Sequence, residues 1–406
     1  THTVREIKTD KNGNVASDKV LSEGKSGQNL KLTINVDFQA GVENILQQYY
    51  GADITSGYAT YSEGAYAVAL NPKTGAVLAM AGLSHDVGST TTQLDALGTI
   101  NDIFVPGSVV KAATLTAGWK SNVISGNQVL TDQPINIAGS PSIKSWFTDY
   151  GSRNITAVQA LEYSSNTYMV QVALKMMGQE YHSGMALSTS GMKKAMEELR
   201  ATYAEYGMGT STGIDLPENT TGYLSKEYSA GNVLTEAFGQ YDSYTPMQLA
   251  QYAATVANGG SRIAPHLVEG IYESDGKGGL GTLTKTIESK VLNKVDISSE
   301  DMDLIHQGFY QVVNGTDAFA TGSHMRSSTV TIAGKTGTAE TYAVDASGNA
   351  VTTINLSVLA YDYSETDDSH IAVAVIIPHL TSDDNHTNQV IARDIINLYM
   401  STYVNK

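Results

Sequence analysis

The sequence predicts an α+β fold: one antiparallel sheet built from both ends of the chain, flanked by helices, with a helical subdomain between the two ends. Short β-rich runs occur before residue 83 and again after residue 327. Between these regions, apolar residues recur with the spacing of amphipathic helices. The 406 residues, 41% of them hydrophobic, suffice to bury the core of one large domain or two modest ones.

The first part of the chain changes character near residue 30. Residues 1–29 are polar and rich in Gly, Asn, Ser and Asp, so we expect a linker or the remnant of a preceding domain. Residues 30–36 (LKLTINV) alternate like a strand, and residues 37–50 have helical apolar spacing. Residues 65–82 predict a hairpin, because two β-rich runs flank a Pro-Lys-Thr-Gly turn.

The middle and the end of the chain contain the remaining elements. The Pro-Gly pair at residues 106–107 predicts that a helix begins near Ser108. Apolar periodicity predicts four further helices, near residues 156–177, 191–206, 245–257 and 300–313. Three β-rich runs predict strands at residues 328–334, 353–361 and 370–378. A final amphipathic run predicts a helix at residues 388–400.

Composition excludes several classes of function. A formal net charge of −16 argues against nucleic acid or an anionic lipid surface as a partner. The absence of cysteine excludes a thiol nucleophile, a thiolate metal site and a disulfide framework. The nine histidines form no metal-binding pattern, so we expect neither a metal nor a cofactor. No apolar run reaches the roughly 18 residues of a membrane span, and the chain starts at Thr1, so we expect a piece of a longer or processed protein.

The pattern Ser-x-x-Lys occurs four times, and one copy differs from the others in its surroundings. Ser108 and Lys111 lie in an apolar run that follows Pro-Gly. The other copies lie in polar, Gly-rich or helix-surface sequence: Ser22/Lys25, Ser190/Lys193 and Ser274/Lys277. One helical turn would place Lys111 within hydrogen-bond reach of the Ser108 hydroxyl. Because burial disfavours the ammonium form, Lys111 could then take the proton of Ser108. The alternative is a lysine that simply extends into water.

The tripeptide Ser164-Ser165-Asn166 interrupts a helical pattern. Serine and asparagine compete for backbone hydrogen bonds, which makes them poor in a helix interior and good at an N-cap or a turn. Two interpretations remain open, a capped helix junction and a loop that presents a hydroxyl and an amide to a cleft. Spacing alone does not decide between them, because a second Ser-x-Asn stands at residues 152–154.

The pattern Lys-Ser/Thr-Gly occurs three times, at residues 25–27, 73–75 and 335–337. Only the third copy ends a predicted strand, over residues 329–334, and continues into Thr338. A glycine at such a place often marks the close approach of another backbone. Lys335, Thr336 and Gly337 would offer a cation, a hydroxyl and an unobstructed main chain to an extended ligand that carries a carboxylate. A nucleotide-binding P-loop does not fit, because residue 329 is Thr where that motif needs glycine.

Taken in order, the three motifs resemble those of the penicillin-binding transpeptidases: Ser108-Val-Val-Lys111, Ser164-Ser-Asn166 and Lys335-Thr-Gly-Thr338. Further stretches are similar to class B members of that family, namely NPKTGAVLAMA, FGQYDSYTPMQLAQYAATVANGG and IARDIINLYM. The resemblance covers residues 30–406 and implies the fold that this family shares with the serine β-lactamases. It also implies that residues 1–29 are the remnant of a pedestal domain. A membrane anchor upstream would hold the protein at the extracytoplasmic face of the cell membrane.

The resemblance implies a catalytic role for each motif. Ser108 would attack the penultimate D-alanyl carbonyl of a peptidoglycan stem peptide, with Lys111 as its general base. The backbone N–H groups of Ser108 and Thr338 would form the oxyanion hole. Ser164 would pass a proton to the leaving D-alanine, and Asn166 would bind the peptide amide.

Binding roles follow from the same resemblance. Lys335 would supply positive potential, and Thr336 with Thr338 would bind the terminal carboxylate along the open main chain of Gly337. Trp146 stands where the family lines the mouth of the cleft with an aromatic, although an ordinary half-buried tryptophan fits the sequence equally well. The implied partners are stem peptides, β-lactam antibiotics and the cell-wall synthesis and division machinery, with no nucleic acid.

Other functions on the same scaffold stay open. A D,D-carboxypeptidase would resolve the acyl-enzyme with water, a β-lactamase would need a group that activates that water, and a sensor would be acylated without turnover. The acids nearest to the motifs in sequence are Glu162 and Glu340. We expect both to be solvated surface carboxylates, which favours a transpeptidase that retains its acyl-enzyme.

Overall fold

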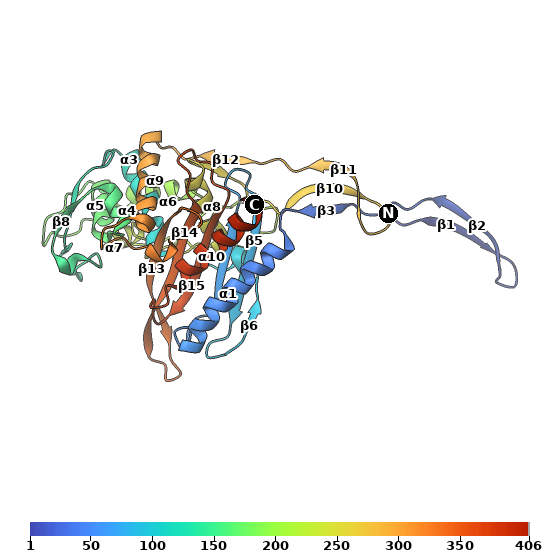
Figure 1. The fold of residues 1–406 in the computed structure, drawn as a ribbon, viewed down its shortest axis with the longest axis horizontal. Helices are drawn as coiled ribbons and strands as arrows, with labels where there is room; N and C mark the ends of the chain where they lie inside the picture. Colours follow the sequence, from blue (N-terminus) through green and yellow to red (C-terminus); the bar gives the residue numbers. More distant parts are fainter. Residues whose placement is uncertain (405–406) are drawn as a thin grey trace. The chain divides into compact units, whose positions relative to one another are not determined.

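The structure, a computed structural model, describes residues 1–404 and divides into two compact units (Figure 1). The first unit combines residues 1–33 with residues 266–288. The second unit contains residues 34–265 and the chain from residue 289 onward. Within residues 1–404, no helix combines the length and the apolar character needed to cross a membrane.

The first unit consists of strands. The N-terminal segment, expected to be a linker, forms an antiparallel hairpin of β1 (Val4–Thr9) and β2 (Val15–Ser22). Strand β10 (Val268–Ser274) pairs on one side with β3 (Asn29–Leu32) and on the other with β11 (Leu280–Thr286). The strand expected over residues 30–36 is present as β3, but it ends at Leu32 and pairs with β10 rather than with the main sheet. The assignment of residues 1–29 to a pedestal domain stays a prediction.

The second unit is built on a six-stranded antiparallel sheet, in the order β13-β14-β15-β4-β5-β6. Its strands come from both ends of the unit, as predicted: β4 (Gly64–Leu70), β5 (Val77–His85), β6 (Thr92–Leu94), β13 (Ile332–Val344), β14 (Ala350–Asp362) and β15 (Ala372–Leu380). The two halves meet where β15 pairs with β4. The predicted hairpin of residues 65–82 is confirmed as β4 and β5. Strand β13 forms one edge of the sheet, and this edge carries the third motif.

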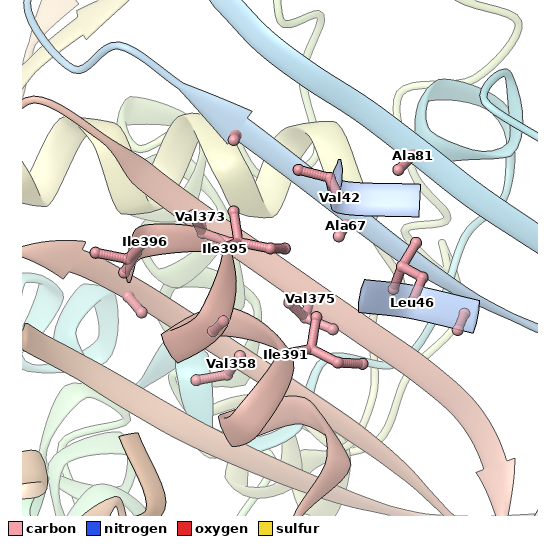
Figure 2. Close-up of a cluster of buried hydrophobic side chains, with 14 of the residues drawn as sticks. Val42, Leu46, Ala67, Ala81, Val358, Val373, Val375, Ile391, Ile395 and Ile396 are labelled. Atoms are coloured by element: carbon pink, nitrogen blue, oxygen red, sulfur yellow. The ribbon is translucent and has the colours of Figure 1, made fainter. Parts of the chain in front are cut away.

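One face of the sheet is covered by two helices that are far apart in sequence, α1 (Val36–Ser56) and α10 (Thr387–Tyr399) (Figure 1). Figure 2 shows side chains of these helices, among them Val42, Leu46 and Ile391, clustered with Val358 and Val375 of the sheet. Burying one such aliphatic side chain stabilises the fold by about 1.5–3 kcal/mol relative to exposing it. This core joins the N-terminal and C-terminal strands into one rigid platform.

The other face contacts the helical part of the unit, where α8 (Pro246–Ala257) packs against β4, β14 and β15. Helix α8 begins with a capping box, in which the Thr245 hydroxyl accepts from the N–H of Gln248 and Pro246 stands at the first helical position. The remaining helices are α2 (Gly98–Asn101), α3 (Lys111–Lys120), α4 (Ala157–Glu162), α5 (Asn166–Met176), α6 (Met192–Glu205), α7 (Ala230–Glu236) and α9 (Ser299–Asn314). Short paired strands complete the unit, β7 (Leu130–Asp132) with β8 (Arg153–Ile155) and β9 (Ser261–Ile263) with β12 (Val291–Lys294).

Two predicted boundaries differ from the structure. The helix expected over residues 156–177 is split into α4 and α5 at Ser164. The strand expected to end at Gly334 instead runs from Ile332 to Val344, so the third motif lies inside β13. The reason is tertiary: β14 pairs with every residue of β13, which keeps the glycine-containing motif extended.

Candidate active site

Ser108 lies on a tight turn that is fixed to the sheet. A 3₁₀ turn spans Gly107–Val110 and leads directly into α3, so the predicted helix start is confirmed. The Ser357 hydroxyl donates to the carbonyl of Pro106 (2.5 Å), and the Asn355 amide donates to the carbonyl of Val105 (3.1 Å). Both anchors come from β14, so the nucleophile candidate is held by the strand next to the third motif.

Two glycines let this turn pack backbone to backbone on β13. A Cβ on Gly107 would lie 2.8 Å from the carbonyl of Thr338, and Gly107 adopts a left-handed φ of 68°. A Cβ on Gly337 would lie 2.8 Å from the carbonyl oxygen of Pro106. The close approach expected at the glycine of the third motif is therefore present. It brings Ser108 beside the backbone of Thr338.

The second motif forms the junction between α4 and α5. The Ser165 hydroxyl caps α5 by accepting from the N–H of Tyr168 (3.0 Å), and Ser164 has a left-handed φ of 56°. A non-glycine residue in this conformation is strained and turns its side chain out of the helical path. The junction is thus both a capped helix start and a display of the Ser164 hydroxyl, so the two interpretations of this motif are compatible.

The buried carboxylate of Asp132 holds the junction between α4 and α5 through hydrogen bonds from serine hydroxyls. The Ser145 hydroxyl donates to Asp132 (2.6 Å) and accepts from the backbone N–H of Asn166 (3.1 Å). The hydroxyl of Ser165 also donates to Asp132. Sequence reasoning missed Asp132 and Ser145, because no motif or spacing connects them to residues about 20–30 positions away. The acid is recognisable only through the hydroxyls that converge on it.

Two buried lysines converge on Ser164. The Lys111 amine donates to the carbonyl of Ser164 (2.7 Å), to its hydroxyl (3.2 Å) and to the Asn166 side-chain oxygen (2.8 Å). The Lys335 amine donates to the Ser164 hydroxyl (2.9 Å) and to the carbonyl of Thr336 (2.8 Å). Both lysines are 0% exposed. The alternative in which Lys111 extends into water is therefore wrong.

Burial weakens the protonated form of both amines. Burial lowers the pKa of Lys111 well below its usual value, and the neighbouring Lys335 lowers it further, whereas Asp132 opposes the shift. Burial alone lowers the pKa of Lys335 to about 7. Two ammonium groups that share one hydroxyl would repel each other. The site therefore favours a neutral Lys111, the state in which an amine can accept a proton. A neutral amine has only two N–H donors, so in that state its lone pair would accept from the Ser164 hydroxyl, while the other two contacts remain donations.

The contacts of Lys111 differ from the expectation in one respect. Its amine was expected to bond to the Ser108 hydroxyl, but no such hydrogen bond is present among residues 1–404. Instead, the Lys111 amine is hydrogen-bonded to the carbonyl of Ser164 and to the side-chain amide oxygen of Asn166. Catalytic hydrogen bonds are often long in the resting state and shorten when substrate binds, so this arrangement is compatible with a base.

A cleft of about 1060 Å³ unites the three motifs. Its walls include Ser108, Trp146, Ser164, Asn166, Thr336 and Thr338. Lys111 and Lys335 are buried beneath these residues, and Gly337 packs on the nucleophile turn. All nine predicted site residues are thus brought together, whereas the other described copies of the three motifs do not line this cleft.

Trp146 is 53% exposed at this cleft, and its indole N–H donates to the carbonyl of Tyr163 (2.8 Å). The ring also lies against Phe319, with ring centroids 5.6 Å apart. This fixed aromatic surface fits a lining role better than the alternative of an ordinary half-buried tryptophan. Sequence reasoning missed other lining residues, including Thr321, whose hydroxyl accepts from that of Thr336 (3.1 Å).

The two acids near the motifs have different environments. Glu162 was expected to be a solvated surface carboxylate, which is wrong: it is 6% exposed and does not line the cleft. Burial raises the pKa of Glu162 to about 7, and the charge of Asp317 contributes. Glu340 is exposed, as expected, and lines the cleft two residues beyond Thr338.

Comparison with known proteins gives consistent matches. The family model described as "Penicillin binding protein transpeptidase domain" matches residues 65–397. Penicillin-binding protein 2B of Streptococcus pneumoniae (strain R6) is 54% identical over 399 residues, which cover 98% of this chain and 58% of that protein. Penicillin-binding protein 2A of Bacillus subtilis is 35% identical over 401 residues, which cover 96% and 54%. The chain therefore spans a little over half the length of these curated relatives.

A solved structure of penicillin-binding protein 2B from Streptococcus pneumoniae (strain R6) is similar with a TM-score of 0.92 and 53% identity. The similarity covers 99% of this chain and 64% of that one. The predicted fold class is thereby confirmed, with helices on an antiparallel sheet. The family model, the relatives and the order of the three motifs agree, and the chain belongs to the penicillin-binding protein transpeptidase family, among its class B members.

Proposed function

We propose that this chain is the transpeptidase domain of a peptidoglycan cross-linking enzyme that acts through an acyl-enzyme on Ser108. One observation carries the proposal: a single cleft holds Ser108, the Ser164 hydroxyl with its two buried amines, and the Thr338 edge of β13. The domain would comprise residues 30–406. Its substrate would be a stem peptide that ends in two D-alanines, and β-lactams would acylate the same serine.

Acylation would proceed by proton transfer and attack at one carbonyl. Lys111, neutral because it is buried, would take the proton from the Ser108 hydroxyl while the oxygen bonds to the penultimate carbonyl carbon. The backbone N–H groups of Ser108 and Thr338 would hold the resulting oxyanion. When the intermediate collapses, the C–N bond to the terminal D-alanine breaks. Ser164, bonded to both amines, would deliver the proton that this leaving nitrogen needs and would regain one from the protonated Lys111.

Substrate binding would use the rest of the cleft. The terminal carboxylate would lie at the hydroxyls of Thr336 and Thr338, in the positive potential of Lys335. Asn166 would bind the peptide amide, and Trp146 would cover the mouth of the cleft. An amine of a second stem peptide would then attack the ester, release Ser108 and complete the cross-link. Partners in the cell-wall synthesis and division machinery, and a location at the outer face of the cell membrane, stay predictions.

Mass spectrometry after exposure to benzylpenicillin tests the assignment of the nucleophile. The intact mass should increase by one penicillin, and peptide mapping should place the adduct on the fragment that contains Ser108. Ser108→Ala should remain folded and unmodified, because a helix-start hydroxyl contributes only about 1 kcal/mol. An adduct on Ser22, Ser190 or Ser274 would contradict the proposal.

A second assay separates cross-linking from related reactions. The chain is incubated with a D-alanyl-D-alanine-terminated peptide and a D-amino acid as acceptor amine. Exchange of the terminal residue supports a transpeptidase, whereas hydrolysis alone supports a carboxypeptidase. Acylation without either product supports a sensor.

A further inference from the structure

The edge of β13 that faces away from β14 has backbone N–H and C=O groups at every second residue, and some of these groups are already hydrogen-bonded within the protein. In the amide orientation that satisfies both of its polar atoms, the side chain of Gln240 accepts from the backbone N–H of Glu340 (2.6 Å) and donates to its C=O (3.2 Å). The backbone groups of Glu340 therefore point away from β14, toward the open edge. Because backbone groups alternate between the two edges of a strand, those of Thr336 and Thr338 also face this edge. The register of β13 with β14 is uninterrupted, so the alternation holds along the whole strand.

Two of these three positions already have protein partners. The carbonyl of Thr336 accepts from the Lys335 amine (2.8 Å), and both backbone groups of Glu340 are bonded to Gln240. Thr338 lies between them, and among residues 1–404 no side chain bonds to its backbone N–H or C=O at this edge. Between Thr336 and Glu340, the edge of β13 thus offers one complete backbone pair, that of Thr338, directly beside the nucleophile turn.

Gln240 is held in place rather than loosely attached. It follows α7 in a short loop, in which the carbonyl of Gly239 accepts from the N–H of Gly107 (2.9 Å). A Cβ on Gly239 would lie 2.0 Å from the carbonyl oxygen of Gly107, so this loop also packs backbone to backbone on the nucleophile turn. The buried Glu236 carboxylate accepts from the N–H of Asp242 (2.9 Å) and closes the loop from behind.

The direction of a bound donor peptide follows from the proposed function, on which this inference rests. Its carboxylate would lie at Thr336 and its scissile carbonyl at Thr338, so the peptide would run antiparallel to β13. The second residue toward the donor's N-terminus would therefore lie opposite Glu340, because only every second residue of an antiparallel pair faces the partner strand with its backbone groups. An extended peptide normally continues to pair along a strand edge, as in β-strand addition.

We propose that Gln240 is a specificity-determining residue that ends strand pairing after Thr338. Its amide imitates one residue of a neighbouring strand and occupies the backbone pair of Glu340. A donor peptide pairs once with the edge and then leaves it. Residues further toward the donor's N-terminus gain no hydrogen bonds from β13. The site therefore discriminates little between donors that differ only in the length of their N-terminal part.

Two thioester donors of different length test this inference. The short donor is N-acetyl-D-alanyl thioester, and the long donor carries two further L-alanines before the D-alanine. The wild-type chain should show kcat/KM values for the two donors within about threefold of each other. Gln240→Ala opens the pair at Glu340, and the long-to-short ratio of kcat/KM should rise about tenfold, the effect of one or two net backbone hydrogen bonds.

A matched variant controls for general damage to the cleft. Thr235 also lines the cleft from α7, but its hydroxyl bonds to the carbonyl of Asn232 and not to β13. Thr235→Ala should leave the long-to-short ratio unchanged, whatever happens to the absolute rates. An equal ratio in Gln240→Ala and the wild-type chain would overturn the inference. If neither donor acylates Ser108 in the wild-type chain, the proposed function fails instead.

Hydrogen exchange provides a test that needs no variant. In the wild-type chain, the amide proton of Glu340 should exchange at least about tenfold more slowly than that of Thr338, because only the former is hydrogen-bonded. Equal exchange of the two protons would show that Gln240 does not close the edge, and would overturn the inference independently of any enzymatic activity.

Discussion

Gly337→Ala tests whether the close approach of β13 to the nucleophile turn is necessary for acylation. The φ of Gly337 lies outside the left-handed region, so alanine fits the backbone there, and the substitution changes only the space beside the strand. The added Cβ would lie 2.2 Å from the Ser357 hydroxyl and 2.8 Å from the carbonyl oxygen of Pro106. Ordinary contact begins near 3.4 Å, so the turn must move by about 0.6 Å or the strand must bend.

The expected loss follows from this displacement. A misplacement of about 1 Å between reacting groups can cost about 100-fold in rate, so acylation should slow by about 10- to 100-fold. Overpacking of this kind typically costs about 1–3 kcal/mol of stability. The stability loss should therefore be moderate, whereas the loss of acylation should be large, because the Ser108 hydroxyl and the Thr338 N–H are no longer aligned.

The assay is the second-order rate of acylation by benzylpenicillin, followed by intact mass, together with thermal unfolding. Gly51→Ala provides the control, because Gly51 lies in α1 with nothing within 4 Å of an added Cβ. That control should acylate normally and be stabilised by up to about 1 kcal/mol. Acylation of Gly337→Ala within threefold of the wild-type rate, with unchanged thermal stability, would refute the reasoning.

Three further predictions concern charge. Lys111→Arg should slow acylation by about 10²- to 10⁴-fold, since a guanidinium cannot accept a proton; near-normal acylation would make Lys111 merely electrostatic. Because burial raises the pKa of Glu162 to about 7 from 4.5, the folded state holds a proton that the unfolded state loses. Stability should therefore fall as pH rises from about 4.5 to 7, and Glu162→Gln should flatten that decline in thermal unfolding. With a chromogenic cephalosporin, one stoichiometric burst followed by slow decay over many minutes is expected, because the three motifs contain no carboxylate that could activate water. Sustained turnover that Glu162→Gln or Glu340→Gln abolishes would indicate a β-lactamase.

The paired lysines explain why the site combines conflicting requirements. In the proposed reaction, the base must be neutral, whereas the carboxylate of the substrate needs a cation nearby. Burial and the charge of Lys335 both lower the pKa of Lys111, whereas burial alone lowers the pKa of Lys335. Lys111 is therefore the amine that more readily becomes neutral. The two amines contact the same Ser164 hydroxyl, so we expect at most one of them to be in the charged ammonium form near neutral pH.

Much of this architecture is legible in the sequence, because it depends on local patterns. Alternation and helical spacing predicted five strands of the main sheet and the longer helices of the second unit. The apolar context of Ser108 and Lys111 distinguished this pair from three other copies of the motif. The order of the three motifs was enough to indicate the family, and the family model and the relatives bear this out.

Only the tertiary structure decided the features that depend on distant residues. Asp132 supports Asn166 through Ser145, and Gln240 closes the edge of β13 at Glu340. No periodicity connects such pairs, because each contact joins elements that meet only after the sheet and helices have packed. The same holds for Glu162, whose sequence context looked solvated. Burial is a property of the packed neighbours rather than of the residue, so the charge state of a carboxylate or an amine is set by the fold around it.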